Sequence, residues 1–298
     1  MTSWQTKAVS AVVRVSGVKK MMSSTDRVRA RVEAVSLRPS SFAPPKHLDR
    51  AVTLSVGHRN HWPVYEIAPK GPAAGRRILY LHGGAYIEEI LIHHWRLAAQ
   101  LARQVPARVC VPVYPLAPHG RATTVVPAAT DILADVIEES GPDNVIVMGD
   151  SAGGGMALAV AQQLRDRYGV QPARIVLISP WLDVTMTHPD QARIERLDPM
   201  LARAGLAEAG RLYADPLDPA DPQVSPLHGT LDGLAPLTVF SGTHDILLTD
   251  SDSLAAKATK AGVPIDYHRA DCLPHVYPLM PVPEGRTARD LIVKACQQ

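Results

Sequence analysis

The sequence predicts an α/β protein with a mostly parallel central sheet, helices on both faces of the sheet, and a helical cap. From residue 51 onward, short β-branched runs alternate with helical patterns, which is the order of successive βαβ units. The runs at residues 145–148 and 175–178 are apolar at every position, as is typical of strands covered on both faces. A long proline-rich stretch then breaks the alternation and indicates an inserted cap.

Short apolar runs are expected to form the strands, and the longer segments between them carry good helix formers and are expected to be crossover helices. The expected strands are residues 51–56, 64–68, 77–81, 107–113, 144–148, 174–178, 237–241 and 265–269. The expected helices are residues 95–104, 128–139, 152–168 and 251–261.

Prolines mark where the chain changes character. Residues 38–46 carry three prolines and end a helical N-terminal arm. A later segment has six prolines around a helical piece at residues 199–213. The expected parts are residues 1–46 (arm), 47–180 with 235–298 (core) and 181–234 (insertion). The insertion follows the carboxyl end of a strand, where ligands bind in parallel sheets, so we favour a lid that covers a site over a segment without a structural role.

The composition limits the class of protein. The chain has 298 residues, 46% of them hydrophobic, which is enough for a full core. Its 31 basic and 29 acidic side chains leave a net charge of +2, which does not favour a nucleic-acid partner. Three cysteines without a CxxC pair favour neither a disulfide framework nor a zinc site, so we expect a cytoplasmic protein without a metal. No apolar run reaches the roughly 18 to 20 residues that span a bilayer, and no signal peptide is expected.

Residues 6–22 combine apolar and basic side chains and are expected to form one amphipathic helix. A rough helical face contains Val9, Val12, Val13 and Met21, with Val15 off it. The basic side chains on the other side are Lys7, Arg14, Lys19 and Lys20. Such a helix can touch a membrane surface as a peripheral contact. Packing of the apolar face on the protein's own core is the favoured alternative, because most amphipathic helices in globular proteins do so.

Residues 149–153 read GDSAG, which matches the G-x-S-x-G pattern of a nucleophilic serine. The segment lies between an apolar strand that ends at Met148 and a helix that begins near Ala152. Glycines two residues before and after Ser151 let the chain turn sharply and raise the hydroxyl above the sheet. The N-terminus of the following helix favours negative charge at that point. We therefore predict that Ser151 is a nucleophile, in preference to a structural turn.

Residues 82–86 read HGGAY and directly follow the expected strand at residues 77–81. A loop of small residues can point backbone N–H groups at the oxygen of a tetrahedral intermediate, where each donor contributes about 3 to 4 kcal/mol. A plain glycine turn is the alternative. The presence of this loop before a nucleophile elbow favours an oxyanion hole.

A serine of this kind needs an orienting acid and a histidine base later in the chain, in that order. His275 is the preferred base, because it lies in the loop after the expected strand at residues 265–269. His268 lies within that strand. The other later histidines are His188, His228 and His244.

Asp245 is the preferred orienting acid, because it lies just past the carboxyl end of the strand at residues 237–241. Its carboxylate can therefore reach an imidazole in the next loop. Asp250 and Asp252 are expected to cap the helix that follows. Asp266 is a further acidic candidate, and His244 and Asp271 are weak rivals in the two roles.

Four segments together resemble bacterial esterases of the hormone-sensitive-lipase family, which have the α/β-hydrolase fold. They are the HGGAY loop, the GDSAGG elbow, GTHD at residues 242–245 and PHVY at residues 274–277. The likeness runs from about Thr53 to the C-terminus, and the arm and insertion resemble that family's cap. It implies a hydrolase for small-molecule esters of short to medium acyl chains that needs no cofactor, and it favours a homodimer.

The resemblance implies that the N–H groups of Gly84, Ala85 and Ala152 form the oxyanion hole and that Gly83 shapes the turn. The family usually has a third glycine where this chain has Ala85. Alanine keeps the N–H group, but we expect it to fit only if its φ is not strongly positive. His82 is implied to be a structural member of its motif and not a base.

The sequence is also compatible with two alternatives to an esterase. One is a non-catalytic receptor for a small apolar ligand, and the other is an amidase or acyltransferase that uses the same triad. Tyr86, Trp181 and Leu206 are candidates for the substrate pocket, and ordinary core packing is an equal alternative for each of them.

Overall fold

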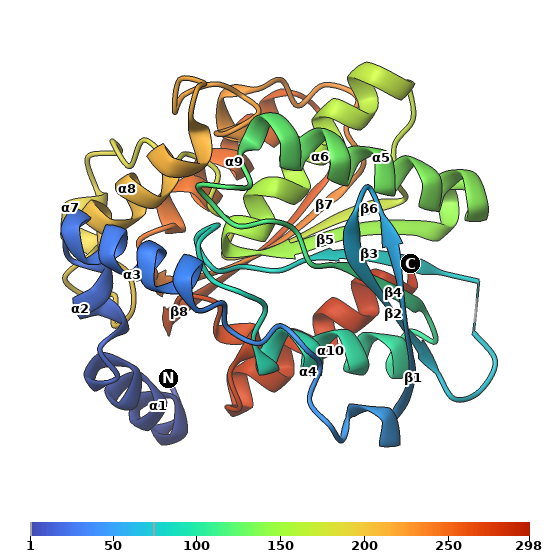
Figure 1. Ribbon diagram of the computed structural model, residues 1–298, viewed down its shortest axis with the longest axis horizontal. Coiled ribbons are helices and arrows are strands. Elements are labelled where there is room, and N and C mark those ends of the chain that lie inside the picture. Colours follow the sequence, from blue (N-terminus) through green and yellow to red (C-terminus); the bar gives the residue numbers. More distant parts are fainter. Residues whose placement is uncertain (1, 74) are drawn as a thin grey trace.

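The computed structural model describes residues 2–73 and 75–298, and its centre is an eight-stranded sheet in the order β1-β2-β4-β3-β5-β6-β7-β8 (Figure 1). The strands are β1 (Val52–Arg59), β2 (Trp62–Pro69), β3 (Arg77–Leu81), β4 (Arg108–Pro112), β5 (Val145–Asp150), β6 (Arg174–Ile178), β7 (Leu237–His244) and β8 (Ile265–Pro274). β2 pairs antiparallel with β1 and with β4, and every other neighbouring pair is parallel. The predicted fold class is confirmed.

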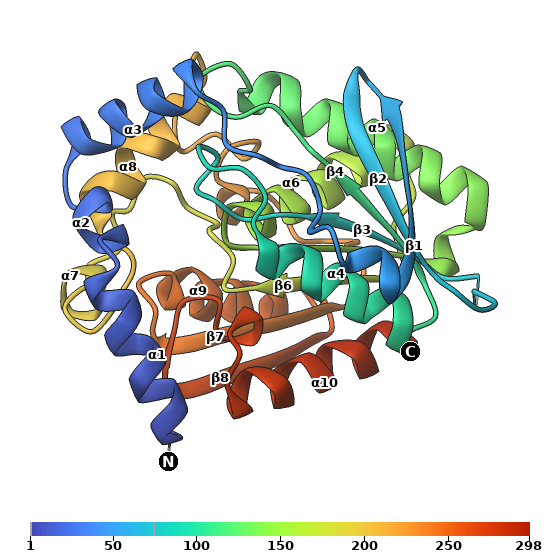
Figure 2. The same ribbon diagram turned by 60° about the horizontal axis from the view of Figure 1, so that its bottom comes forward.

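Helices cover both faces of this sheet (Figures 1 and 2). The helices on one face are α5 (Ala122–Ser140), α6 (Ser151–Tyr168) and α9 (Leu248–Lys260), and those on the other are α4 (Ile92–Gln104) and α10 (Pro283–Gln297). The helix α10 was not expected from the sequence, although Pro283 at its first position and the helix-forming run after it are a start signal. Among the helices described, none is both long and apolar enough to cross a membrane.

Residues 145–148 of the central strand β5 are all apolar because each face of the sheet has its own core. Val145 and Val147 pack in the core that contains α5 and α6, whereas Ile146 and Met148 pack in the core that contains α4 and α10. Successive side chains of a strand point to opposite faces, so burial of both faces requires an apolar residue at every position. Ser151 directly follows this strand, at the first position of α6.

The N-terminal arm consists of α1 (Trp4–Val15), α2 (Val18–Met22) and α3 (Thr25–Leu37), with residue 1 outside the described residues. The expected single helix at residues 6–22 is therefore wrong: it breaks at Gly17, whose φ is +88°. The arm packs on α8 (Arg203–Ala214) of the insertion. A Cβ at Gly205 would lie 2.2 Å from the carbonyl oxygen of Met22, so the glycine permits this close approach.

Asp250 ties the start of the insertion to the core. Its Oδ2 accepts the backbone N–H groups of Leu182 and Asp183 at 2.8 and 3.0 Å. The expectation that Asp250 and Asp252 cap a helix is wrong, because α9 already begins at Leu248 and both residues lie inside it. Burial raises the pKa of Asp250 to about 7, against the effect of the two N–H donors.

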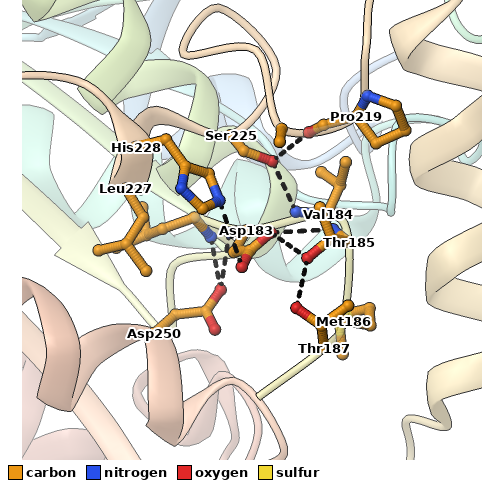
Figure 3. Close-up of polar contacts among 12 residues, drawn as sticks. Asp183, Val184, Thr185, Met186, Thr187, Pro219, Ser225, Leu227, His228 and Asp250 are labelled. Atoms are coloured by element: carbon orange, nitrogen blue, oxygen red, sulfur yellow. Dashed lines mark hydrogen bonds and ion pairs between the residues drawn. The ribbon is translucent and has the colours of Figure 1, made fainter.

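Polar contacts also join the two ends of the insertion to each other (Figure 3). Ser225 Oγ accepts the N–H of Val184 at 2.9 Å and donates to the carbonyl oxygen of Pro219 at 2.6 Å. His228 Nε2 lies 3.4 Å from a carboxylate oxygen of Asp183. The insertion therefore forms a folded unit in which proline-rich segments are held by hydrogen bonds and not by regular secondary structure.

Candidate active site

The nucleophile elbow forms where β5 ends and α6 begins. Ser151 has a φ of +51°, a left-handed conformation that strains a residue with a side chain. A Cβ at Gly149 would lie 2.1 Å from the carbonyl oxygen of Gly153, and a Cβ at Gly153 would lie 2.1 Å from that of Leu81. Both glycines are therefore needed because backbone segments approach closely, which is the physical reason for the G-x-S-x-G pattern here.

The three residues expected to form a triad come together at the carboxyl edge of the sheet. Ser151 Oγ lies 2.9 Å from His275 Nε2, and His275 Nδ1 lies 2.9 Å from Asp245 Oδ2. Ser151 is only 7% exposed, and His275 and Asp245 are buried. The other oxygen of Asp245 accepts the N–H of Leu247 at 2.9 Å, which fixes the carboxylate. The serine hydroxyl, the imidazole and the carboxylate thus form a continuous hydrogen-bonded chain.

Charged neighbours determine the electrostatics of His275. Burial by itself lowers the pKa of His275, but the carboxylates of Asp245, Asp198 and Asp150 outweigh burial, so that the pKa is raised above its ordinary value. A base with a raised pKa binds a proton more readily and stabilises the imidazolium that forms when it deprotonates serine.

The raised pKa of His275 predicts the acid limb of the pH–rate profile. The base must be neutral to accept the serine proton, so kcat/KM should fall as pH drops through the pKa of His275. We expect the midpoint of this fall above the value of about 6.5 that an ordinary imidazole shows. Hydrolysis rates of a soluble ester between pH 5 and 9 measure it, with buffers of constant ionic strength as the control. An acid limb centred below that value would contradict the charge arrangement described above.

The loop at residues 82–86 lies directly against the nucleophile. A Cβ at Gly83 would lie 3.0 Å from Ser151 Cβ and 2.4 Å from a carboxylate oxygen of Asp150. The N–H of Gly83 donates to Asp150 Oδ1 at 3.1 Å, so Gly83 positions the loop. Among the described residues, no acceptor is found for the N–H of Gly84 or Ala85. The N–H of Ala152 belongs to the first turn of α6, where helices lack internal acceptors.

Ala85 does not keep the ordinary backbone that we expected of an alanine at this position. Its φ is +50°, and it lies between Gly84 at +130° and Tyr86 at +62°. The expectation was wrong because the left-handed region near +50° is accessible to a residue with a Cβ at a cost of about 1 to 2 kcal/mol. The loop therefore keeps its left-handed course without the third glycine, and Ala85 and Tyr86 both carry the backbone strain.

Asp150 supports the loop at residues 82–86 through hydrogen bonds, a role that was not predicted from the sequence. Its Oδ1 accepts the hydroxyl of Tyr80 at 2.6 Å as well as the N–H of Gly83, and its Oδ2 lies 3.3 Å from His94 Nε2. Burial favours a raised pKa for Asp150, but His94 and Tyr80 outweigh burial and hold the pKa well below its usual range. Asp150 is therefore an ionised anchor for the loop. Its place within the GDSAG motif was the only signal in the sequence.

His82 is a structural residue. Its Nδ1 donates to the carbonyl oxygen of Gly83 at 2.7 Å, and its ring stacks on Tyr114 with 4.3 Å between centroids. Burial and the nearby His94 lower the pKa of His82 to about 3, so the ring is neutral at physiological pH. These contacts agree with the local role expected for it.

Asp198 is a second acidic residue beside the triad that the sequence analysis missed. It comes from the insertion and is fully buried, and its Oδ2 accepts the N–H of Ile246, next to Asp245, at 2.9 Å. Its Oδ1 accepts the N–H groups of Met200 and Leu201 at 2.7 and 2.9 Å. Burial and the charge of Asp245 raise the pKa of Asp198. The insertion thus contributes a carboxyl group that holds the loop of Asp245 in place.

The three pocket candidates lie where the insertion meets the core. Tyr86 stacks on Tyr213 with 3.6 Å between centroids and on Trp181 with 5.6 Å. The backbone N–H of Trp181 donates to the carbonyl oxygen of Ser151 at 2.9 Å, so this residue adjoins the nucleophile. Tyr86, Trp181 and Leu206 are buried, so they pack as core residues. A role in substrate binding stays a proposal.

The rival residues have other partners. His268 stacks on Phe240 and lies 3.0 Å from Asp266 at the exposed edge of β8. The hydroxyl of Tyr267 donates to Asp252 at 2.7 Å. His244 and Asp271 line a hollow beside α1. His275 and Asp245, which were preferred from the sequence, are the histidine and the acid that form the hydrogen-bonded chain with Ser151.

A strained serine at a strand-to-helix turn, hydrogen-bonded to a buried histidine and carboxylate, defines a serine hydrolase of the α/β-hydrolase class. A family model described as the alpha/beta hydrolase fold matches residues 78–279. The chain is 36% identical over 228 residues to a triacylglycerol lipase of Mycobacterium tuberculosis, an alignment that covers 76% of this chain and 47% of the lipase. It is 34% identical over 219 residues to an acetyl-hydrolase of Streptomyces hygroscopicus, with 72% and 73% covered.

Solved structures agree with these relatives. The crystal structure of an esterase from the bacterial hormone-sensitive lipase family superposes with a TM-score of 0.84 at 27% sequence identity, covering 100% of this chain and 98% of that chain. The chain therefore belongs to the hormone-sensitive-lipase family of α/β-hydrolases. It spans about half the length of the mycobacterial lipase, at 47%.

Proposed function

We propose that this chain is a carboxylesterase that cleaves esters of short to medium acyl chains through an acyl-enzyme on Ser151. The observation that carries the proposal is the hydrogen-bonded chain from Ser151 through His275 to Asp245, with 2.9 Å at each step. A receptor for an apolar ligand has no need for an activated serine. Two of the relatives, named an acetyl-hydrolase and an ethyl acetate hydrolase, support small acyl groups.

The geometry supports a two-step reaction. His275 Nε2 takes the proton from Ser151 as Oγ attacks the ester carbon, and Asp245 stabilises the imidazolium. The N–H groups of Gly84, Ala85 and Ala152 would stabilise the negative oxygen, at about 3 to 4 kcal/mol for each donor. His275 then gives its proton to the leaving alcohol. In the second step His275 activates a water molecule, which releases the acid and restores Ser151.

The cap supports the preference for short to medium acyl chains. Tyr86, Trp181 and Leu206 are buried where the arm and insertion close over the nucleophile, and we propose that they line the acyl pocket. Aromatic side chains packed this tightly leave a long chain little room. A reducing, cytoplasmic location is supported by three free cysteines, Cys110, Cys272 and Cys296. The homodimer stays a prediction from the family resemblance.

A chain-length series tests the proposal. The p-nitrophenyl esters from acetate to palmitate and the matching butyryl anilide are assayed together. We expect kcat/KM for the butyrate ester to exceed that of the palmitate ester by about tenfold or more and that of the anilide by about a hundredfold or more. Labelling by a fluorophosphonate probe, read by mass spectrometry, is the control for an activated serine. Equal rates on ester and anilide would indicate an amidase, and absence of both labelling and turnover would favour a receptor.

A further inference from the structure

The helix α1 presents its apolar side chains to solvent. Trp4 is 74% exposed, Val12 is 65% exposed and Val15 is 82% exposed. Ala8 and Ala11 are also exposed. Residues at these spacings lie on one side of an α-helix, so together they form a continuous outward stripe, here called the α1 stripe. Isolated exposed apolar residues need no explanation, but a stripe along a whole helix indicates a contact surface.

Polar contacts on the opposite side keep the α1 stripe facing outward. The hydroxyls of Ser3 and Thr6 donate to Glu284 Oε2, in the first turn of α10, at 2.8 and 2.7 Å. Thr6 is the buried residue of α1, and Val9 and Val13 are half-buried on the same side. Rotation of α1 to bury the stripe would break the contacts with Glu284. The favoured expectation that the apolar face packs on the protein's own core is therefore wrong for Val12.

The surface around the α1 stripe is cationic. Residues 2–25 contain Lys7, Arg14, Lys19 and Lys20 and no acidic residue. Lys7, Arg14 and Lys20 are exposed, while Lys19 binds backbone carbonyl groups of the insertion. Both views show α1 at the edge of the molecule, beside the ends of β7 and β8 (Figures 1 and 2). An outward apolar stripe with a tryptophan and flanking cations complements an anionic lipid surface.

We propose that α1 docks the protein on bilayers rich in anionic phospholipid, with Trp4, Val12 and Val15 entering the headgroup region. Tryptophan favours this region because its ring is apolar while its N–H group can stay hydrated. A second copy of the chain is a poorer occupant. Two α1 helices that met about a twofold axis would bring Lys7 and Arg14 toward their own copies, without acidic partners on either helix.

Docking through α1 has a consequence for the active site that rests on the proposed function. A hollow of about 970 Å³ lies between α1 and the end of β8, lined by Thr6 and Ser10 on one side and by Cys272 and Leu273 on the other. Leu273 is two residues before His275 in the same segment. Binding through the α1 stripe would bring this hollow and the histidine loop to the membrane, where apolar esters concentrate.

Vesicle binding tests the proposal without reference to catalysis. Trp62, Trp95 and Trp181 are buried, so a fluorescence change on binding reports Trp4. With phosphatidylglycerol vesicles, the emission should shift to shorter wavelength and become protected from acrylamide. Co-sedimentation should show affinity at least about tenfold higher than for phosphatidylcholine vesicles, because each cation near an anionic surface contributes about fivefold, and salt should reduce it.

Two matched pairs of variants assign the binding to α1. Val12→Asp with Val15→Asp should reduce affinity for phosphatidylglycerol vesicles by about tenfold or more, whereas Leu37→Asp with Val56→Asp, also at exposed apolar residues, should not. Lys7→Glu with Arg14→Glu should give a similar loss. Its control is Lys260→Glu with Lys294→Glu, which makes the same charge change at exposed sites elsewhere.

Circular dichroism and hydrolysis of soluble p-nitrophenyl butyrate should be the same for these variants and the wild type. Absence of vesicle binding by the wild type, or equal binding by the α1 variants and their controls, would overturn the proposal. So would a concentration-dependent dimer that the α1 variants abolish, because a second copy would then cover the stripe. If the wild type binds vesicles but hydrolyses no ester, the proposed function fails and the docking surface stands.

Discussion

Ser151→Ala is expected to reduce kcat for p-nitrophenyl butyrate hydrolysis by a factor on the order of 10⁶. In the proposed reaction the Ser151 hydroxyl forms the covalent bond, and its hydrogen bond to His275 of 2.9 Å is the first link of the chain that activates it. Alanine removes one oxygen atom and leaves the elbow, the loop and the carboxylate in place. The backbone N–H donors that remain can stabilise a negative oxygen only if another nucleophile attacks the ester carbon.

The control for this variant is Ser251→Ala. Ser251 is buried in α9, and no partner for its Oγ is found among the described residues. Its replacement should change kcat less than about twofold. Fluorophosphonate labelling should occur in the wild type and the control and be absent in Ser151→Ala. Retention of hydrolysis by a correctly folded Ser151→Ala protein would show that the serine is not the nucleophile.

Asp245→Asn is expected to lower kcat by about 10³- to 10⁴-fold at neutral pH, whereas Asp198→Asn should lower it by less than about tenfold. Both carboxyl groups are buried beside His275, but Asp245 contacts the ring, with Oδ2 lying 2.9 Å from Nδ1. An amide at residue 245 can hold the wrong tautomer and cannot balance the imidazolium charge. Asp198 acts through the N–H of Ile246 and through its charge.

The two variants differ in their pH profiles as well as in rate. Asp198 raises the pKa of His275, so its neutral replacement should shift the acid limb of kcat/KM to lower pH with the high-pH plateau largely kept. A purely structural role would lower the plateau and leave the limb in place. Thermal unfolding of both variants controls for loss of fold. If kcat of Asp198→Asn were as low as that of Asp245→Asn, Asp198 would have to act directly on His275, as Asp245 does.

Local patterns were sufficient for the elbow and the central strands. The turn at Ser151 depends on glycines two residues away on each side, and residues 145–148 of β5 and 175–178 of β6 are all apolar because both faces are buried. These causes act within a few residues, so a single sequence contains them. His275 and Asp245 could also be predicted from the sequence, because the order of the strands places their loops at the same edge of the sheet.

Contacts between distant segments were beyond a local pattern. Asp150 binds His94 and Tyr80, which are 56 and 70 residues away, and nothing at any one of these positions reports the others. In the sequence Asp198 is an ordinary loop residue. Only the folded insertion places its carboxylate against the N–H of Ile246, next to Asp245. The left-handed φ of Ala85 is likewise imposed by the loop around it, because alanine itself disfavours that conformation.

The sequence by itself predicted the sheet, the turn at Ser151 and the preferred histidine and acid, because residue spacing controls strand, turn and helix over short distances. Only the tertiary structure decided that Asp198 and Asp150 also lie near His275 and which side of α1 faces solvent. Those outcomes depend on how segments far apart in the chain pack together. In α1, hydrogen bonds to Glu284 outweigh the ordinary tendency of valines to turn inward, and the sequence pattern of that helix contains no sign of this distant partner.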